Sequence, residues 1–340
     1  MSKLEECILG DLVEFQRGYD LPKSKFVEGK YPVQSSNGIL GYHNEYKVEG
    51  PGITIGRSGT VGTPHLIREN FFPHNTSLFV KEFKGNDIEY IYYLLQYLDL
   101  GNQKSGSGVP TMNRNHLHPI KIRAYRDKTY QQRTIKILSL IDKKIQINNQ
   151  INQELEAMAK TLYDYWFVQF DFPDQNGKPY KSSGGKMVYN PELKREIPEG
   201  WGVESVGNLL DKVTKAEKIE NNSIEFIGEI PVIDQSQKYI AGFTNNENAI
   251  LQPQDGHVIF GDHTRVVKYI NFDYARGADG TQVLISNNEN ISNVLLYHMI
   301  EDFDLSNYGY ARHFKFLKEK TVIVPDKEVS SKFETQLCYS

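Results

Sequence analysis

Polar stretches in the first and last thirds of the sequence hold the side chains best suited to chemistry, and their types favour hydrogen bonding to nucleic-acid bases. Arg, Asn, Gln, Ser and His match the donor and acceptor patterns that base pairs present in a groove. The candidates in the first third are Gln34, Ser35, Ser36, Asn37, Arg57, Ser58, Asn75, Lys104, Ser105, Asn113 and Arg114. The candidates in the last third are Asp234, Gln235, Asp262, Arg265, Asp279, Tyr308, Tyr310, Arg312 and His313. Each residue alone could equally belong to a solvated loop, so the prediction depends on the clusters.

Two of these clusters leave a choice of role open. The stretch from Gly56 to Gly62 lacks the spacing of a dinucleotide fingerprint and the Lys-Ser/Thr pair of a P-loop. Its backbone amides and Arg57 could bind a phosphate, or the stretch could form a structural hairpin. The aspartates Asp234, Asp262 and Asp279 could accept a hydrogen bond from cytosine N4, or they could cap turns.

The residues that a catalytic or metal site would need are not in suitable arrangements. The segment Asn190-Pro191-Glu192-Leu193 lacks the second proline and the aromatic ring of an amino-methyltransferase motif. His116 and His118 have no third ligand at a metal-binding spacing, and Cys7 and Cys338 lie at opposite ends of the chain. We therefore expect no catalytic residue, no metal and no cofactor.

Composition describes a globular chain whose charge is unevenly distributed. Of 340 residues, 39% are hydrophobic and 24% are charged, and the net charge is −4. Lys and Arg number 15 against 14 Asp and Glu in residues 1–127, 11 against 9 in residues 128–200, and 13 against 20 in residues 201–340. The acidic last segment argues against non-specific nucleic-acid binding by the whole surface, so recognition would depend on local loops or basic partners. No apolar run has the length of a signal peptide or a membrane span, which favours a cytoplasmic protein.

A long helix in the middle of the chain is the element that must separate the two sets of clusters. From Gln131 to Phe167 there is no Gly or Pro, and apolar residues recur at alternating steps of three and four. The expected partner interface on this seam consists of Leu138, Ile141, Ile145, Asn148, Asn152, Leu155, Leu162 and Trp166. The two asparagines would fix the register of that packing. Such a helix would extend roughly 55 Å, although it could instead be the core helix of one large domain.

The segments on either side of this helix resemble each other. Val206–Lys212 repeats the pattern of Leu9–Phe15, and Gly256–Asp262 repeats that of Gly52–Arg57. Three further landmarks follow in the same order at a period of about 200 residues, which indicates a duplicated domain. Each copy has β-branched strand patterns and one amphipathic helix near its end. We therefore predict an α+β fold with two similar strand-rich domains joined by a long coiled-coil-type helix.

Four motifs carry a resemblance to a known family. They are Tyr130–Arg133 (Tyr-Gln-Gln-Arg), Ile141–Ile145 (Ile-Asp-Lys-Lys-Ile), Tyr163–Phe167 (Tyr-Asp-Tyr-Trp-Phe) and Ile197–Trp201 (Ile-Pro-Glu-Gly-Trp). With the duplicated domain, they make the chain resemble the specificity subunit of a type I restriction-modification system. The resemblance implies that each copy is a target-recognition domain for one half of a split double-stranded DNA site. It also implies a non-catalytic chain whose helix acts as a ruler and docks two methyltransferase subunits, with restriction subunits joining through the complex.

The predicted domains follow from these signals. They are a first target-recognition domain at 1–127, a spacer helix at 128–170, a loop-like linker at 171–200, a second target-recognition domain at 201–326 and the start of a second spacer helix at 327–340. Members of the family have a longer second spacer helix that packs antiparallel on the first. We therefore expect either a truncated form or a partner helix from another chain, for example in a homodimer. The alternative function is a non-enzymatic scaffold whose duplicated domains bind protein or carbohydrate and whose helix oligomerises.

Overall fold

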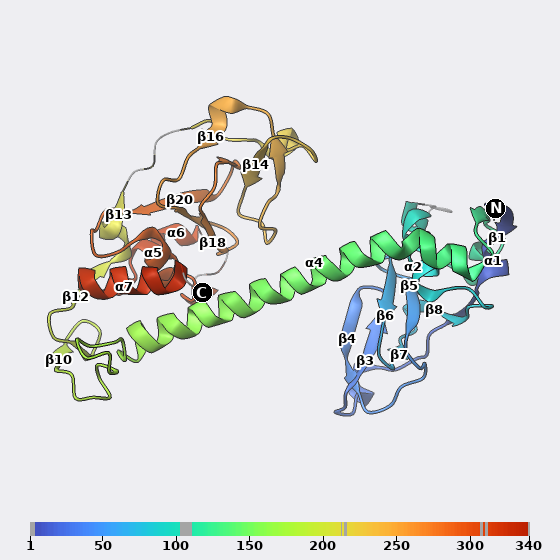
Figure 1. The fold of residues 1–340 in the computed structure, drawn as a ribbon, viewed down its shortest axis with the longest axis horizontal. Coiled ribbons are helices and arrows are strands. Elements are labelled where there is room, and N and C mark those ends of the chain that lie inside the picture. Colours follow the sequence, from blue (N-terminus) through green and yellow to red (C-terminus); the bar gives the residue numbers. More distant parts are fainter. Residues whose placement is uncertain are drawn as a thin grey trace. The chain divides into compact units, whose positions relative to one another are not determined.

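The chain folds into two compact units. The computed structural model describes residues 4–102, 111–211, 213, 216–306, 309 and 312–338. Unit 1 comprises residues 1–149 and unit 2 comprises residues 150–340. The long helix α4 (Lys128–Tyr163) contributes its first part to unit 1 and its last part to unit 2 (Figure 1).

Unit 1 consists of three small sheets around an apolar core. The strands pair in the orders β1–β9, β2–β8–β5–β6 and β4–β3–β7. Their bounds are β1 (Glu5–Ile8), β2 (Glu14–Arg17), β3 (Tyr31–Ser35), β4 (Gly38–His43), β5 (Gly52–Gly56), β6 (Pro64–Ile67), β7 (Phe72–Pro73), β8 (Ser77–Glu82) and β9 (Lys121–Ala124). The helices before α4 are α1 (Leu9–Leu12), α2 (Ile88–Tyr97) and α3 (Arg114–Leu117). Phe15, Ile53, Ile91 and Leu95 are fully buried where α2 packs on the four-stranded sheet.

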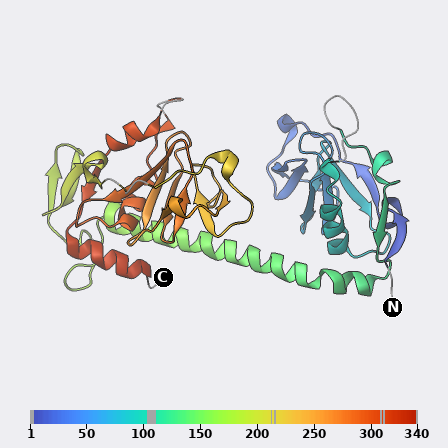
Figure 2. The same cartoon turned by 90° about the horizontal axis from the view of Figure 1, so that it is seen from above.

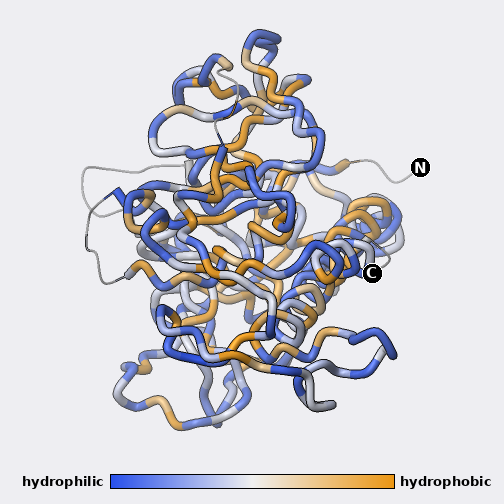
Figure 3. The backbone as a smooth tube through the Cα atoms, turned by 90° about the vertical axis from the view of Figure 1, so that its left-hand side faces the viewer, coloured by the Kyte–Doolittle hydropathy of each residue, from blue (hydrophilic) through white to orange (hydrophobic). Residues whose placement is uncertain are grey.

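Unit 2 contains strands and helices in a corresponding order. Its strands pair as β12–β21, β13–β20–β17–β18 and β15–β14–β19–β16. Their bounds are β12 (Gly202–Ser205), β13 (Leu210–Asp211), β14 (Ile230–Ile233), β15 (Gly242–Thr244), β16 (Ile250–Leu251), β17 (His257–Gly261), β18 (Val267–Ile270), β19 (Tyr274–Arg276), β20 (Thr281–Ser286) and β21 (Thr321–Val324). The helices that follow β20 are α5 (Asn293–Ile300), α6 (His313–Lys318) and α7 (Lys327–Cys338). Hydrophobic and hydrophilic stretches follow one another along the backbone (Figure 3).

The two units share one topology, which confirms the predicted duplication of a strand-rich domain. Strands β2, β8, β5 and β6 pair in the same order as β13, β20, β17 and β18. In both units a parallel pair, β3 with β7 or β14 with β19, belongs to the second sheet. In both, the strand that pairs with the first strand, β9 or β21, runs directly into a helix, α4 or α7.

Helix α4 is one continuous helix of 36 residues, as the absence of Gly and Pro predicted (Figure 1 and Figure 2). It begins at Lys128, the predicted first residue of the spacer helix, and Asp127 caps it by accepting hydrogen bonds from the amides of Thr129 and Tyr130 at 2.8 and 3.1 Å. A π-helical turn, η3 (Asp164–Val168), continues it. Phe170 then ends the helical path in the left-handed region, with φ of 67°. No helix in the described part of the chain is long and apolar enough to cross a membrane.

The segment expected to be a loop-like linker, residues 171–200, forms more structure than its polar composition indicated. Strands β10 (Met187–Asn190) and β11 (Arg195–Pro198) pair as a hairpin. Phe172 stacks on Trp201 with ring centroids 5.0 Å apart, and Ile197 is 3% exposed. The hairpin contradicts the loop prediction for residues 187–198, and Phe172 and Ile197 join the core of unit 2.

Candidate nucleic-acid interface

Three turns of unit 1 that carry predicted residues lie together. They are joined by Thr76, whose carbonyl oxygen accepts hydrogen bonds from the amides of Arg57 and Ser58 at 2.8 and 3.1 Å. The Thr76 hydroxyl lies 3.3 Å from the amide nitrogen of Ser36 and accepts from it. The β3–β4 turn, the β5–β6 loop and the β7–β8 turn therefore form one surface.

The segment before α3 joins the same surface. The Met112 amide donates to the Arg57 carbonyl oxygen at 2.8 Å, and Asn113 caps α3 by accepting from the amide of Asn115 at 3.0 Å. We define face 1 by the exposed or half-exposed predicted residues of these segments: Asn37, Arg57, Ser58, Asn75, Asn113 and Arg114. These are side chains that can donate to and accept from base edges or phosphates.

Three predicted residues of unit 1 are buried instead. Gln34, Ser35 and Ser36 are 3, 8 and 6% exposed. The Ser35 hydroxyl donates to the carbonyl oxygen of Gly38 at 2.8 Å, and Gln34 Nε2 donates to the carbonyl oxygen of Ser35 at 3.4 Å. Their assignment to DNA contact is corrected, because these side chains shape the β3–β4 turn.

An acidic residue that sequence reasoning missed also lies at face 1. The Asn75 side-chain amide donates to the carboxylate of Asp20, which also accepts from the guanidinium of Arg17 at 3.0 Å. Arg17 is the last residue of β2, which pairs with β8, and it is exposed. Arg17 and Asn75 are far apart in the sequence, and only the pairing of β2 with β8 brings Arg17 close to Asn75. Lys104, Ser105, Tyr308 and Tyr310 lie outside the described residues.

In unit 2 two predicted residues are buried in one helix cap. Asp262 and His313 are 4 and 3% exposed. The Asp262 carboxylate accepts from the amide of Phe314 at 2.8 Å, and its carbonyl oxygen accepts from the amide of His313 at 2.9 Å. Asp262 therefore fixes the start of α6, which selects capping over cytosine recognition for this residue and corrects both assignments.

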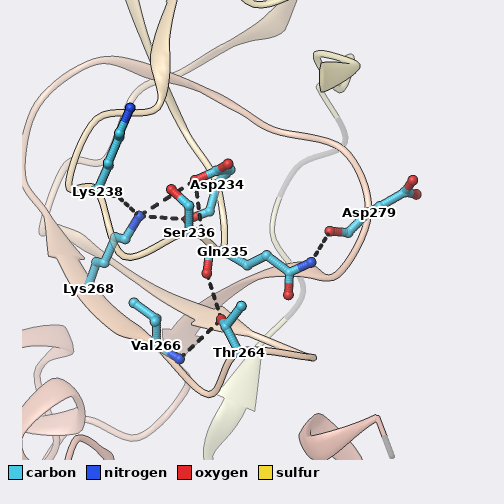
Figure 4. A network of polar contacts seen from close by, with 8 residues as sticks. All are labelled: Asp234, Gln235, Ser236, Lys238, Thr264, Val266, Lys268 and Asp279. Carbon is cyan, nitrogen blue, oxygen red and sulfur yellow. Dashed lines mark hydrogen bonds and ion pairs between the residues drawn. The ribbon is translucent and has the colours of Figure 1, made fainter. Parts of the chain in front are cut away.

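The other two aspartates are partly engaged in turns. Asp234 Oδ1 accepts from the amide of Ser236 at 2.9 Å, which closes a turn after β14. Asp279 has φ of 52° and an exposed side chain, while its carbonyl oxygen accepts from Nε2 of Gln235 at 2.8 Å (Figure 4). Gln235 therefore joins the loop after β14 to the segment between β19 and β20.

Two exposed arginines of unit 2 lie in loops that correspond to those of face 1. Arg265, with φ of 65°, lies in the β17–β18 loop, the counterpart of the β5–β6 loop that carries Arg57. Arg312 is the N-cap residue of α6, as Asn113 is of α3. Arg265 therefore shares its loop with the counterpart of Arg57, which is Asp262: the carbonyl oxygens of Arg57 and Asp262 accept from the amides of Met112 and His313 in the same way. We define face 2 by its exposed residues: Gln237, His263, Arg265, Asp279 and Arg312.

His116 and His118, which lie two residues apart in the sequence, have different environments. The ring of His118 stacks on Phe15 with centroids 5.9 Å apart, and its Nε2 accepts from the amide of Phe15 at 3.0 Å. His116 is exposed. Within the described residues, no group of three or more His, Cys, Asp or Glu side chains could hold a metal ion.

Unit 1 should lose stability as the pH falls below about 6.5, and His118 should be one cause. Burial, with Lys84 nearby, lowers the pKa of His118 from its ordinary value of 6.5. The unfolded chain therefore binds the proton first, and the neutral ring's contribution disappears as the pH falls from 6.5 through the lower folded pKa. Urea unfolding of His118→Gln should show a weaker pH dependence than the parent chain, whereas His116→Gln should not. An equal pH dependence in all three would contradict this.

The predicted partner seam on α4 is mostly exposed in the chain by itself. Leu138, Ile141, Ile145 and Leu155 are 46, 50, 53 and 40% exposed. Asn148 and Asn152 are also exposed, and Leu162 is half-buried. An apolar stripe of this kind is typical of a surface that another helix covers.

Trp166 is an exception on this seam and corrects the prediction. It is 6% exposed, and its ring lies 5.8 Å from that of Phe333 on α7. Leu337, one turn further along α7, lines a hollow with Ala157 and Leu162. Phe333 thus lies by Trp166, whereas the later residue Leu337 lies by the earlier residues Ala157 and Leu162. Helix α7 therefore runs antiparallel to the end of α4. Trp166 is therefore part of the core of unit 2.

Comparison with known proteins relates this geometry to a family. Residues 1–157 match the model of the type I restriction modification DNA specificity domain. Over 142 residues the chain is 31% identical to the MjaIX specificity subunit of a type I restriction enzyme from Methanocaldococcus jannaschii, covering 41% of this chain and 30% of that one. Over 67 residues it is 49% identical to the HindI specificity subunit from Haemophilus influenzae, covering 20% and 14% of the two chains. Residues 1–157 therefore resemble the DNA specificity domain of type I restriction-modification systems.

The fold is similar to that of a solved structure along most of the chain. It superposes on the crystal structure of a type I restriction-modification system S subunit from M. genitalium with a TM-score of 0.63, over 98% of this chain and 88% of that one, at 15% identity. This likeness concerns the fold. Within this fold, faces 1 and 2 lie on corresponding loops of two copies of one domain. The segments matched in the first two curated relatives span less than a third of each relative's length.

Proposed function

We propose that this chain is a non-catalytic DNA-recognition subunit that reads a split double-stranded site. The observation that carries the proposal is the equivalence of faces 1 and 2, since the same loops of a duplicated fold present polar and cationic side chains in both units. A duplicated reader suits a site with two separate halves of different sequence. Methyl transfer and cleavage would belong to other subunits of the complex.

The helix α4 supplies the second part of the proposal. It belongs to both units and has no break, so it can fix the spacing between half-sites. Its exposed seam, including Leu138, Ile141 and Ile145, would dock methyltransferase subunits. The same seam could support a homodimer, and self-association is the main feature of the competing scaffold function.

Selection of bound duplexes from a random pool tests the proposed function. We expect the chain together with its methyltransferase partner to enrich two short conserved half-sites separated by a gap of fixed length and variable sequence. A scaffold that binds protein or carbohydrate would enrich no duplex, and one contiguous site would contradict the two-reader model.

Arginines on the two faces should differ measurably in role. Replacing an arginine that reads a base should weaken binding by about 1–3 kcal/mol and relax preference at one position. Replacing one that binds phosphate should weaken all sequences alike and lower the salt slope by about one. We expect Arg57→Ala, Arg265→Ala and Arg312→Ala each to show one of these patterns in binding titrations at several salt concentrations. Unchanged affinity for every duplex would remove the tested residue from the interface.

A further inference from the structure

A single side chain connects the loops behind face 2. Gln235 Nε2 donates to the carbonyl oxygen of Asp279 at 2.8 Å, and Oε1 accepts from the amide of His263 at 3.1 Å. The carbonyl oxygen of Gln235 accepts from the hydroxyl of Thr264 at 2.6 Å (Figure 4). Gly280, with φ of 77°, leaves room for this arrangement, because a Cβ there would lie 2.7 Å from Gln235 Nε2. Both the nitrogen and the oxygen of the side-chain amide thus bond within the protein.

A buried lysine, Lys268, binds the loop Asp234–Lys238 that contains Gln235. Lys268 on β18 is 5% exposed, and its Nζ donates to the carbonyl oxygens of Asp234 and Lys238 at 2.8 and 2.6 Å (Figure 4). The Asp234 carboxylate lies 3.8 Å away. Burial lowers the pKa of Lys268, and Asp234 opposes that shift. One ammonium group therefore joins both ends of the Asp234–Lys238 loop.

The fold itself does not require this lysine. Lys268 pairs with Ile259, two residues before Gly261 at the end of β17. The equivalent position in unit 1 is His65, which pairs with Thr54, two residues before Gly56 at the end of β5. Unit 1 forms the same sheet without a lysine there. Since burying an ammonium is costly, its presence in unit 2 points to a need for that particular loop.

We propose that Lys268 and Gln235 are positioning residues that fix the Asp234–Lys238 loop and thereby set the base preference of face 2 without touching DNA. The inference rests on the proposed function and reassigns Gln235 from contact to support. We call the hydrogen bonds of Lys268 and Gln235 to these loops the clamp. The exposed residues around it, including Gln237, His263 and Arg265, would contact the DNA. A loop held in one conformation presents one pattern of donors and acceptors, whereas a mobile loop can adapt to several base pairs.

The first experiment measures the clamp without DNA. The side chain of Lys238 is exposed and its carbonyl oxygen is bound by Lys268, so trypsin can cut after Lys238 once the loop opens. In Lys268→Met the rate of this cleavage should rise by about ten-fold, because local opening then requires less free energy. The fragment should disappear in Lys268→Met combined with Lys238→Met, which identifies the site. An unchanged rate would overturn the clamp.

The second experiment measures base preference by selection from random duplexes, with the methyltransferase partner present. In Lys268→Met the half-site read by face 2 should lose preference by about ten-fold at one or more positions, while the other half-site and the gap stay unchanged. Lys238→Met removes a charge from the same loop and should keep the preference, because its side chain takes no part in the clamp. Gln235→Glu, which keeps an acceptor but loses the donor to Asp279, should reproduce the effect of Lys268→Met.

The outcomes separate this inference from the proposed function. A parent chain that enriches no duplex contradicts both. Faster tryptic cleavage with an unchanged second half-site would leave DNA recognition intact and overturn the positioning role. A loss of both half-sites in Lys268→Met indicates general unfolding, and Gln235→Glu then decides between the two views.

Discussion

Replacing Gln131 with leucine should lower the free energy of unfolding of unit 1 by about 3 kcal/mol. Gln131 is fully buried, and its Nε2 donates to Asn86 Oδ1 and to the carbonyl oxygen of Tyr125, both at 2.7 Å. Its Oε1 accepts from the amide of Asp87 at 2.8 Å. Leucine is of similar size but leaves these buried groups without a partner, which is the costly case. Urea unfolding followed by circular dichroism would measure the change.

Gln132→Leu is the matched control for this prediction. Gln132 is exposed and makes one hydrogen bond, to the Asp87 carboxylate at 3.1 Å. The same chemical change one residue along should therefore lower stability by less than about 1 kcal/mol. Equal effects of the two substitutions would contradict the role given to Gln131, which also anchors the start of α4 to α2.

Inserting four helical residues after Gln150 should lengthen the preferred gap between half-sites by about two base pairs, since four residues add roughly 6 Å of helix. Gln150 lies in an exposed part of α4, so the insertion leaves the cores of both units unchanged. Both half-site sequences should stay the same. Selection from random duplexes with the parent and inserted chains measures both quantities at once.

The same insertion after Asn222, in the exposed turn η5 (Asn221–Ser223), is its control. It lengthens the chain without lengthening α4, so the gap should not change. If the insertion in α4 altered the half-sites and left the gap unchanged, the helix would not set the spacing.

The sequence was sufficient for the architecture because periodic patterns determine it. The absence of Gly and Pro after Gln131 and the steps of three and four predicted α4. The repeated landmarks predicted two copies of one domain, and the strand orders confirm them. Helix α4 begins at Lys128, the expected bound, where Asp127 caps it.

The sequence was insufficient for the roles of individual loop residues. Asp262 and Arg265 lie three residues apart in one polar loop, yet the first is buried in a helix cap and the second is exposed. Gln235 and Gln34 were assigned to contact on residue type alone, although their amides bond within the protein. Such roles depend on which loops meet after strand pairing. That information is not contained in residue type or spacing.

The burial of both tryptophans in unit 2 determines what intrinsic fluorescence can report. The chain has two tryptophans, Trp166 and Trp201, which are 6 and 7% exposed in one aromatic cluster with Phe167. Unit 1 has only tyrosine and phenylalanine as aromatic fluorophores. Excitation at the red edge of absorption, where tyrosine does not absorb, therefore follows unit 2 alone. Denaturation curves of tryptophan emission and of circular dichroism will coincide only if the two units unfold together.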